Sequence, residues 1–225
     1  METKWELYDL GRTTHKPIKG LYEFIINNAQ RFDPEHAEKL VEHAVNRKTP
    51  GYSMPQEYFT RMCEIWVKAH YDGEFPIDIE ENIYPDTIPR FQQIKAAGRK
   101  IGILTSGTRD FTEIFYSMPV PGTDQKLSDL VDDYFLGEEI GDKAEPETYE
   151  RIWEKTQGGI WAIVDDKPKV CRAALEGLDA IGGNADHIFW MDRNNKYDEK
   201  TIQEMASLGI IRISSFDEIP KYEMD

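Results

Sequence analysis

Four short segments of this chain carry side chains whose types suit chemistry on a phosphate group. Asp9 and Thr105 each follow an apolar run with the composition of a β-strand. Lys143 precedes a helix-like segment, and Asp165 and Asp166 close a third apolar run. Together they offer a carboxylate nucleophile, a hydroxyl, an ammonium and a pair of acids for a cation. This inventory favours a metal-assisted hydrolase that works through an aspartate.

The first three positions have complementary roles in such a reaction. Asp9 can attack phosphorus and form an acyl-phosphate, which divides one hard displacement into two. The hydroxyls of Thr105 and Ser106 and the backbone N–H of Gly107 can hold phosphoryl oxygens at a helix N-terminus. Lys143 can neutralise the nucleophile and the developing charge. Each also has a purely structural interpretation, as a turn aspartate, a helix cap or an exposed loop lysine.

The paired acids predict a cation site. Two adjacent carboxylates at the end of a buried strand are costly without a cation, and oxygen ligands of this kind suit Mg²⁺. Such an ion would also contact Asp9 and offset the repulsion among the acids. The structural alternative for Asp165 and Asp166 is a solvated turn, although Lys167-Pro168 begins a helix directly afterwards.

These segments need a scaffold that brings distant strand ends together. Apolar runs alternate with helical periodicity over most of the chain and predict a parallel sheet with right-handed crossovers. Strands are expected at residues 5–8, 100–104, 133–136, 160–164, 188–190 and 210–213, and helices at 88–97, from about 109, 146–156, 168–178 and 201–208. The expected fold class is a Rossmann-like three-layer α/β/α core. Ligands in such sheets bind beyond the carboxyl ends of the strands.

Residues 17–73 show helical periodicity without a convincing strand and predict an inserted all-helical module. A first helix has Leu21, Phe24 and Ile25 at helical spacing. A second is expected to start near Asp33 and to end at the break formed by Thr49, Pro50 and Gly51. Its predicted buried face is Leu40, Val41, Ala44 and Val45. A third is expected from about Pro55, with the apolar stripe Phe59, Met62, Cys63, Trp66 and Val67.

Composition and charge exclude several kinds of partner. The 225 residues include 42 acidic and 27 basic side chains, for a net charge of -15, which argues against nucleic acid as the partner. No apolar run reaches the roughly 20 residues that cross a bilayer, and the N-terminus lacks a secretory pattern. Cys63 and Cys171 are expected to be reduced and packed. We therefore expect a cytoplasmic protein with a small-molecule phosphorylated substrate and no membrane partner, either monomer or homodimer.

The pattern resembles the haloacid dehalogenase superfamily over nearly the whole chain. Residues 9–13, Asp-Leu-Gly-Arg-Thr, are similar to its D-x-D-G-T motif, and Thr105 matches the hydroxyl residue of its second motif. Lys143 with Pro146 and Tyr149 resembles its lysine motif, and residues 164–166 its last acidic motif. The resemblance implies Mg²⁺ as cofactor, a core at residues 1–15 and 84–225, and a helical cap at 16–83. Short matches at residues 9–14, 105–108 and 143–149 also resemble the enolase-phosphatases.

Three positions depart from the family pattern, and one of them is Val170, which replaces an acid often found late in the last motif. Gly11 stands where the resemblance implies an acid that protonates the leaving group, and Arg12 stands where it implies glycine. The backbone carbonyl of Gly11 can still bind Mg²⁺, because that ligand needs no side chain. Loss of a general acid usually costs about 10²–10⁴-fold in rate. A cap residue, His15 or water would have to replace it, unless the leaving group needs no protonation.

Three functions therefore stay open. The first is a Mg²⁺-dependent phosphohydrolase acting on a small phosphorylated metabolite through an aspartyl-phosphate. The second is cleavage of a carbon–halogen or carbon–phosphorus bond, which in the Schiff-base version needs a lysine from the cap. The candidates for that lysine are Lys16, Lys19, Lys39, Lys48 and Lys68. The third is a non-enzymatic relative that keeps the fold to bind a ligand.

Overall fold

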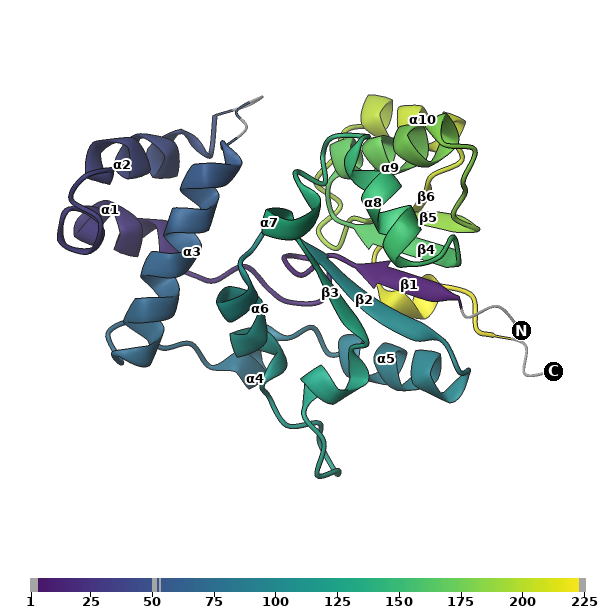
Figure 1. The fold of residues 1–225 in the computed structure, drawn as a ribbon, viewed down its shortest axis with the longest axis horizontal. Helices are drawn as coiled ribbons and strands as arrows, with labels where there is room; N and C mark the ends of the chain where they lie inside the picture. The colour runs from purple at the N-terminus through teal and green to yellow at the C-terminus, as the bar shows by residue number, and fades with distance from the viewer. Residues whose placement is uncertain (1–3, 50–51, 53, 223–225) are drawn as a thin grey trace.

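The computed structural model describes residues 4–49, 52 and 54–222. Its centre is a six-stranded parallel sheet with the order β3-β2-β1-β4-β5-β6 (Figure 1). The strands are β1 (Trp5–Tyr8), β2 (Lys100–Thr105), β3 (Asp133–Leu136), β4 (Ile160–Asp165), β5 (His187–Met191) and β6 (Ile211–Ile213). All six predicted strands are present. Because β1 lies between β2 and β4, the carboxyl ends that carry Asp9, Thr105 and Asp165 are neighbours.

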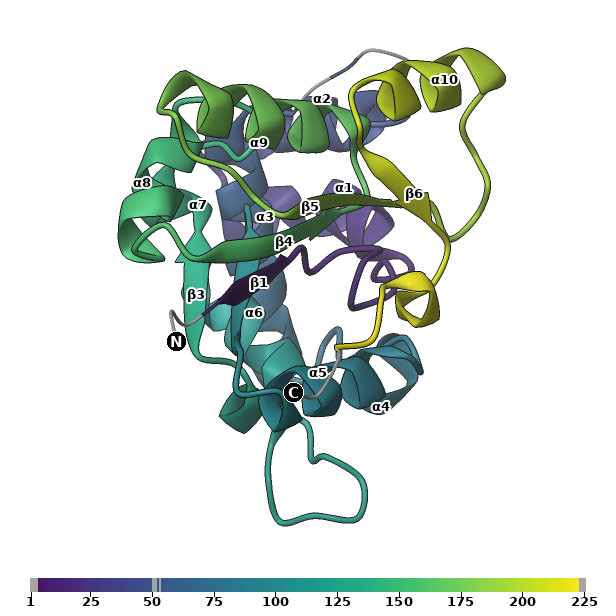
Figure 2. The same cartoon turned by 90° about the vertical axis from the view of Figure 1, so that its right-hand side faces the viewer.

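Helices cover both faces of the sheet, as Figure 2 shows. One face packs on α5 (Thr87–Ala96) and α6 (Arg109–Tyr116). The other packs on α8 (Thr148–Lys155), α9 (Pro168–Ala180) and α10 (Glu199–Ser207). Along β1, Leu7 faces the second set and Tyr8 the first, since side chains alternate across a strand. Because both faces are covered, β4 is buried along its whole length. The predicted three-layer α/β/α core is confirmed.

Three longer helices follow the loop after β1: α1 (Leu21–Phe32), α2 (Ala37–Asn46) and α3 (Gln56–Tyr71). They lie to one side of the sheet in Figure 1. The module is held to the core by α3, which packs on α6. There Trp66 is fully buried, with its ring centroid 5.1 Å from that of Phe111 and 5.6 Å from that of Phe115. The all-helical character predicted for this stretch is correct.

The second of these helices differs from its prediction in two respects. It begins at Ala37 with His36 at the cap position, so the predicted start near Asp33 was wrong. The Asp33 carboxylate instead binds the His36 ring at 2.9 Å and Arg61 at 3.1 Å. Val45 was expected on the buried face but is 56% exposed. Of the predicted break, Pro50 and Gly51 lie outside the described residues.

Four short elements were not predicted: α4 (Ile79–Asn82), α7 (Gly137–Ile140) and two 3₁₀ turns at Leu127–Leu130 and Phe216–Glu218. A single turn is too short to show helical periodicity, so these elements could not be predicted from the sequence. Among the described residues, no helix has the length and apolar character needed to cross a bilayer.

Candidate active site

The loop after β1 holds Asp9 at the carboxyl end of the central strands of the sheet. Its backbone N–H donates to the carbonyl of Val164 at 2.9 Å, which ties the end of β1 to β4. The loop then turns back, and Thr13 Oγ1 donates to Asp9 Oδ2 at 3.2 Å. Thr14 Oγ1 donates to the carbonyls of Asp9 and Leu10 at 3.2 and 3.1 Å. Asp9 is therefore a buried carboxylate with a defined orientation, which an exposed turn aspartate would lack.

Lys143 links the first and last predicted segments. Its side chain is 3% exposed, so the interpretation as an exposed loop lysine was wrong. The ammonium contacts Asp9 Oδ1 and donates to Asp165 Oδ2 at 2.6 Å. Burial opposes its charge, but the two carboxylates outweigh burial and raise the pKa of Lys143 above its ordinary value. Lys143 is held as a cation between two acids from different strands.

Three carboxylates form a compact cluster at the same edge. One oxygen each from Asp9, Asp165 and Asp166 lies within 4.8 Å of the others, and all three residues are buried. Burial raises the pKa of Asp9 to about 7, with Asp165 and Asp166 adding to the increase and Lys143 opposing it. Burial, followed by the charge of Asp165, also raises the pKa of Asp166. Lys143 is hydrogen-bonded to two of these three buried acids but not to Asp166, so the cluster favours an added cation.

The donor set fits Mg²⁺, which prefers carboxylate and carbonyl oxygens. Asp166 Oδ2 is buried and has no hydrogen-bond partner among the described residues. Lys196 Nζ and Arg12 Nη1 lie 3.5 and 3.8 Å from this oxygen, within ion-pair range but not in hydrogen-bond geometry. The oxygens of Asp165, in contrast, accept bonds from Lys143 and from the backbone N–H of Lys167 at 2.8 Å. Asp166 is therefore the better placed of the pair to bind a cation.

The second predicted segment, after β2, is also at this edge. Thr105 is 5% exposed, and its Oγ1 accepts the N–H of Gly107 at 3.0 Å. The cap of α6 is Thr108, whose Oγ1 accepts the N–H of Phe111 at 3.3 Å. Thr105 and Ser106 are not needed as caps, and both line the cavity beside Asp9. Gly107 is not among the described residues that line this cavity, and its N–H, which was expected to bind phosphate, is donated to Thr105.

Gly11 and Arg12 differ in their surroundings and in their backbone conformation. A Cβ added at Gly11 would meet no atom within 4 Å, so the position has room for a side chain. Arg12 has φ 64°, the left-handed region that glycine adopts freely. An L-residue pays about 1 kcal/mol there. The backbone at position 12 thus keeps the conformation expected of a glycine, while an arginine occupies it.

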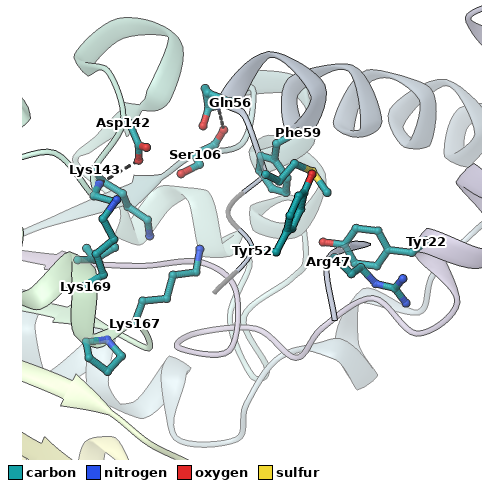
Figure 3. A pocket seen from close by; sticks show the side chains of 14 residues that line it. Tyr22, Arg47, Tyr52, Gln56, Phe59, Ser106, Asp142, Lys143, Lys167 and Lys169 are labelled. Atoms are coloured by element: carbon teal, nitrogen blue, oxygen red, sulfur yellow. Dashed lines mark hydrogen bonds between the residues drawn. The ribbon is translucent and has the colours of Figure 1, made fainter. Parts of the chain in front are cut away.

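Two adjoining cavities open over these residues. The first, about 250 Å³, is lined by Asp9, Gly11, Arg12, Thr105, Lys143 and Asp166 from the core and by Tyr22 and Phe59 from the helical module. The second, about 450 Å³, shares Tyr22, Phe59, Ser106, Lys143 and Lys167 with the first. Figure 3 shows Lys167 and Lys169 on one side of the second cavity, facing Tyr52 and Phe59 on the other. A ligand bound at Asp9 would touch both the core and the helical module.

His15 does not supply the missing acid. It is fully buried with its ring 5.1 Å from the Phe115 ring and 5.2 Å from the Tyr116 ring, and it does not line either cavity. Burial lowers the pKa of His15 to about 3, so the ring is neutral near pH 7. The proposal that His15 replaces the acid is therefore wrong.

No protein-family model matches this chain. Enolase-phosphatase E1 from Fusarium vanettenii is 29% identical over 119 residues, which cover 50% of this chain and 47% of that protein. The match thus spans about half the length of that relative. A putative haloacid dehalogenase-like hydrolase from Bacteroides fragilis aligns over 97% of this chain and 100% of its own, with a TM-score of 0.62 and 14% identity. The chain has the haloacid dehalogenase fold.

Other structures with the haloacid dehalogenase fold show how varied its members are. CbbY from Rhodobacter sphaeroides, solved in complex with phosphate, has a TM-score of 0.59 at 14% identity, with 96% of both chains covered. A phosphatase from Thermococcus onnurineus and a dehalogenase share the fold as well. The resemblance predicted from the motif residues is confirmed at the level of architecture. Sequence identities this low do not distinguish phosphatase activity from dehalogenase activity.

Some residues of the site were missed by the sequence analysis. Lys167 lines both cavities, and its place directly after Asp166 was the signal that could have found it. Phe59 was expected in the buried stripe of α3 but is half-buried and lines both cavities. Tyr22 carried no signal, because an aromatic residue on an amphipathic helix usually belongs to a core. Their role depends on how the helical module meets the core, which local sequence does not encode.

Proposed function

We propose that this chain is a Mg²⁺-dependent phosphohydrolase acting on a small phosphorylated metabolite through an aspartyl-phosphate on Asp9. The observation that carries the proposal is the convergence of a buried carboxylate, an ammonium and an acidic cluster at one cavity. Asp9, Lys143 and Asp165 come from segments up to 156 positions apart and are joined by direct contacts. Such an assembly of buried charge has no evident structural purpose, because apolar packing is usually at least as stabilising.

The side chains of the site divide the work of phosphoryl transfer. An oxygen of Asp9 attacks phosphorus, and Thr13 and Lys143 hold that carboxylate in orientation. Thr105 and Ser106 supply hydroxyls to the phosphoryl oxygens, and Lys143 offsets the charge that develops on them. Asp9, Asp165, Asp166 and the backbone oxygen of Gly11 would hold Mg²⁺. When bound, the ion neutralises the acids and polarises a phosphate oxygen.

In this proposal, residues 16–83 form the cap and residues 1–15 and 84–225 form the core. The supporting observation is the shared lining of the cavities, with Tyr22 and Phe59 from the cap opposite Lys143 and Lys167 from the core. A substrate held between them is shielded from water on both sides, which strengthens the electrostatic interactions of the site. The cap would therefore choose the substrate, while the core performs the transfer.

A panel of phosphate esters, assayed with Mg²⁺ and with EDTA, tests the proposal. We expect hydrolysis that EDTA abolishes and that Asp9→Asn lowers by at least about 10³-fold, the order seen when a nucleophile is removed. Asp110→Asn is the matched control, because Asp110 is an exposed acid outside both cavities. Activity that survives EDTA, or that survives Asp9→Asn, would contradict the proposal.

One observation favours a second candidate, cleavage of a carbon–phosphorus bond through a Schiff base. Of the lysines considered for that role, Lys16 lines the cavity around Asp9. Its Nζ donates to the Glu81 carbonyl at 2.6 Å, so it would have to leave that bond to react. Borohydride treatment with phosphonoacetaldehyde should then trap a covalent adduct in the parent and in Lys19→Arg, but not in Lys16→Arg. Absence of any adduct excludes this candidate.

The non-enzymatic alternative is tested by Gly11→Asp, for which the site has room. A parent without activity on any ester, combined with an active Gly11→Asp variant, would favour a binding protein. A parent that is already active excludes it.

A further inference from the structure

Among the described residues that line the cavity around Asp9, none offers a carboxyl group outside the acidic cluster to protonate a leaving group. The only carboxyl groups among these residues are Asp9 and Asp166 of the acidic cluster. The Lys143 ammonium is engaged by the carboxylates of Asp9 and Asp165, and burial raises the pKa of Tyr22. Lys16 donates to the Glu81 carbonyl. A leaving oxygen in this cavity must therefore depart without protonation from these groups.

Arg12 is the cation that the geometry offers to such an oxygen. It lines the cavity with Asp9, and its side chain is 53% exposed. The one ion pair it forms among the described residues is with Asp166, at 3.8 Å, too long for a hydrogen bond. Its guanidinium N–H groups, five in all, thus keep donors for a ligand.

The backbone at Arg12 is an independent sign of function. At φ 64° a glycine would be free of strain, yet the position holds a long charged side chain. Backbone strain of this kind is concentrated at functional sites, where the side chain brings a benefit that offsets it. Next to it, Gly11 provides no side chain and leaves open space. The two positions together replace a possible acid with room and a fixed positive charge.

We propose that Arg12 stabilises the departing oxygen of the substrate as an anion, and that the substrates are phosphate esters of acidic hydroxyls, such as enols and phenols. This inference rests on the proposed function. An oxygen of Asp9 forms its bond to phosphorus, and the bond from phosphorus to the leaving oxygen breaks. The electron pair remains on that oxygen, which leaves as an anion beside the guanidinium and takes a proton from solvent. Esters of simple alkyl alcohols would react slowly, because their oxyanions are too basic.

The test is the dependence of kcat/KM on the pKa of the leaving phenol, measured with Mg²⁺ and a series of aryl phosphates. In the parent we expect kcat/KM to fall as that pKa rises, and in Arg12→Gln to fall more steeply. The loss in Arg12→Gln should reach about 10²-fold for the least acidic phenol, the order found for removing one donor to an oxyanion. It should be severalfold or less for the most acidic. Arg12→Lys should restore most of the parent slope.

Two further variants distinguish the effect of the Arg12 charge from the effect of backbone strain and from the effect of a general acid. Arg12→Gly removes the charge and relieves the strain, so it should show the same steep dependence as Arg12→Gln. Gly11→Asp introduces an acid into the open space and should flatten the dependence. A readout without turnover is the absorbance of bound 4-nitrophenol, whose pKa the parent should lower and Arg12→Gln should not.

The results that overturn the inference differ from those that overturn the proposed function. If Arg12→Gln hydrolyses the esters with the same dependence of kcat/KM on leaving-group pKa as the parent, Arg12 is rejected as the stabilising group, whether or not Mg²⁺ affinity changes. If the dependence of kcat/KM on leaving-group pKa steepens in Lys167→Gln and not in Arg12→Gln, Lys167 is the residue that stabilises the leaving oxygen, and Arg12 is again rejected. Absence of hydrolysis of every ester, with and without Mg²⁺, rejects the proposed function and this inference with it.

Discussion

At the scale of single residues, burial decides what each ionisable group near β1 can do. Asp9 and His15 are six positions apart and both buried, and burial disfavours the charged form of each. Burial, to which the charges of Asp165 and Asp166 add, raises the pKa of Asp9 to about 7, while the Lys143 ammonium opposes this increase and gives the carboxylate a charged partner. His15 packs on aromatic rings, so its charged form is disfavoured. The first is suited to chemistry and the second to packing.

The buried His15 predicts a loss of stability in mild acid. Its pKa is about 3 in the folded chain and 6.5 when exposed, so below pH 6.5 the unfolded chain binds the proton and the folded chain does not. Stability due to this residue is complete above pH 6.5 and falls as pH decreases toward 3. Between pH 7 and pH 5 the decrease is about 2 kcal/mol. Urea unfolding at the two values measures it.

The comparison variant is His15→Phe, which keeps an aromatic ring among Phe115 and Tyr116. Its free energy of unfolding should change between pH 7 and pH 5 by about 2 kcal/mol less than that of the parent. Equal changes in the two proteins would show that His15 is protonated in the folded state.

At the scale of elements, α9 approaches the segment before α8 closely. Gly177 lies inside α9, and a Cβ there would be 2.1 Å from the carbonyl oxygen of Pro146. That oxygen belongs to the segment just before α8, which also carries Lys143. Helix packing and the placement of the ammonium are therefore coupled at this contact.

This contact reverses the usual effect of replacing glycine in a helix. Alanine normally stabilises a helix interior by about 1 kcal/mol. Gly177→Ala should instead destabilise the protein by about 1–3 kcal/mol, because the backbone carbonyl must move. Glu176→Ala, at an exposed neighbouring position, should change stability by less than about 0.5 kcal/mol. Chemical denaturation of the two variants gives the comparison, and a stabilised Gly177→Ala would contradict the packing described here.

The strands and most helices could be predicted because their signals are local. Residues 160–164 are a continuous apolar run, and the two acids that follow the run are visible in the sequence. The burial of Lys143 could not be predicted, since it depends on two carboxylates contributed by other strands. The start of α2 was misjudged because Asp33 had two stronger partners, His36 and Arg61, than a helix N-terminus.

At the scale of the whole molecule, buried polar contacts tie distant parts of the chain together. Glu6 on β1 is fully buried and binds Arg90 at 2.9 Å, Tyr8 at 2.7 Å and the hydroxyl of Tyr222. Tyr222 also accepts a bond from Arg90 at 2.8 Å. The final described residue is thus joined to the first strand of the sheet. This network could not be predicted from the sequence, because its members are separated by up to 216 positions.

Removing one hydroxyl tests how far the network supports the fold. Tyr222→Phe leaves the buried Glu6 carboxylate with one donor fewer and should lower the free energy of unfolding by about 1–3 kcal/mol. Tyr71→Phe is the control, since Tyr71 is 72% exposed and should have a negligible effect. Thermal unfolding of both variants is sufficient, and equal midpoints would show that the Tyr222 contact contributes nothing.

The most direct measurement of the central claim is a crystal structure with Mg²⁺ and beryllium fluoride, which mimics a phosphoryl group on a carboxylate. We predict that beryllium fluoride binds Asp9 in contact with Thr105 and Lys143, with the cation between Asp9 and Asp166. Fluoride bound elsewhere, with Lys143 still joining Asp9 to Asp165 and no cation among the acids, would contradict it.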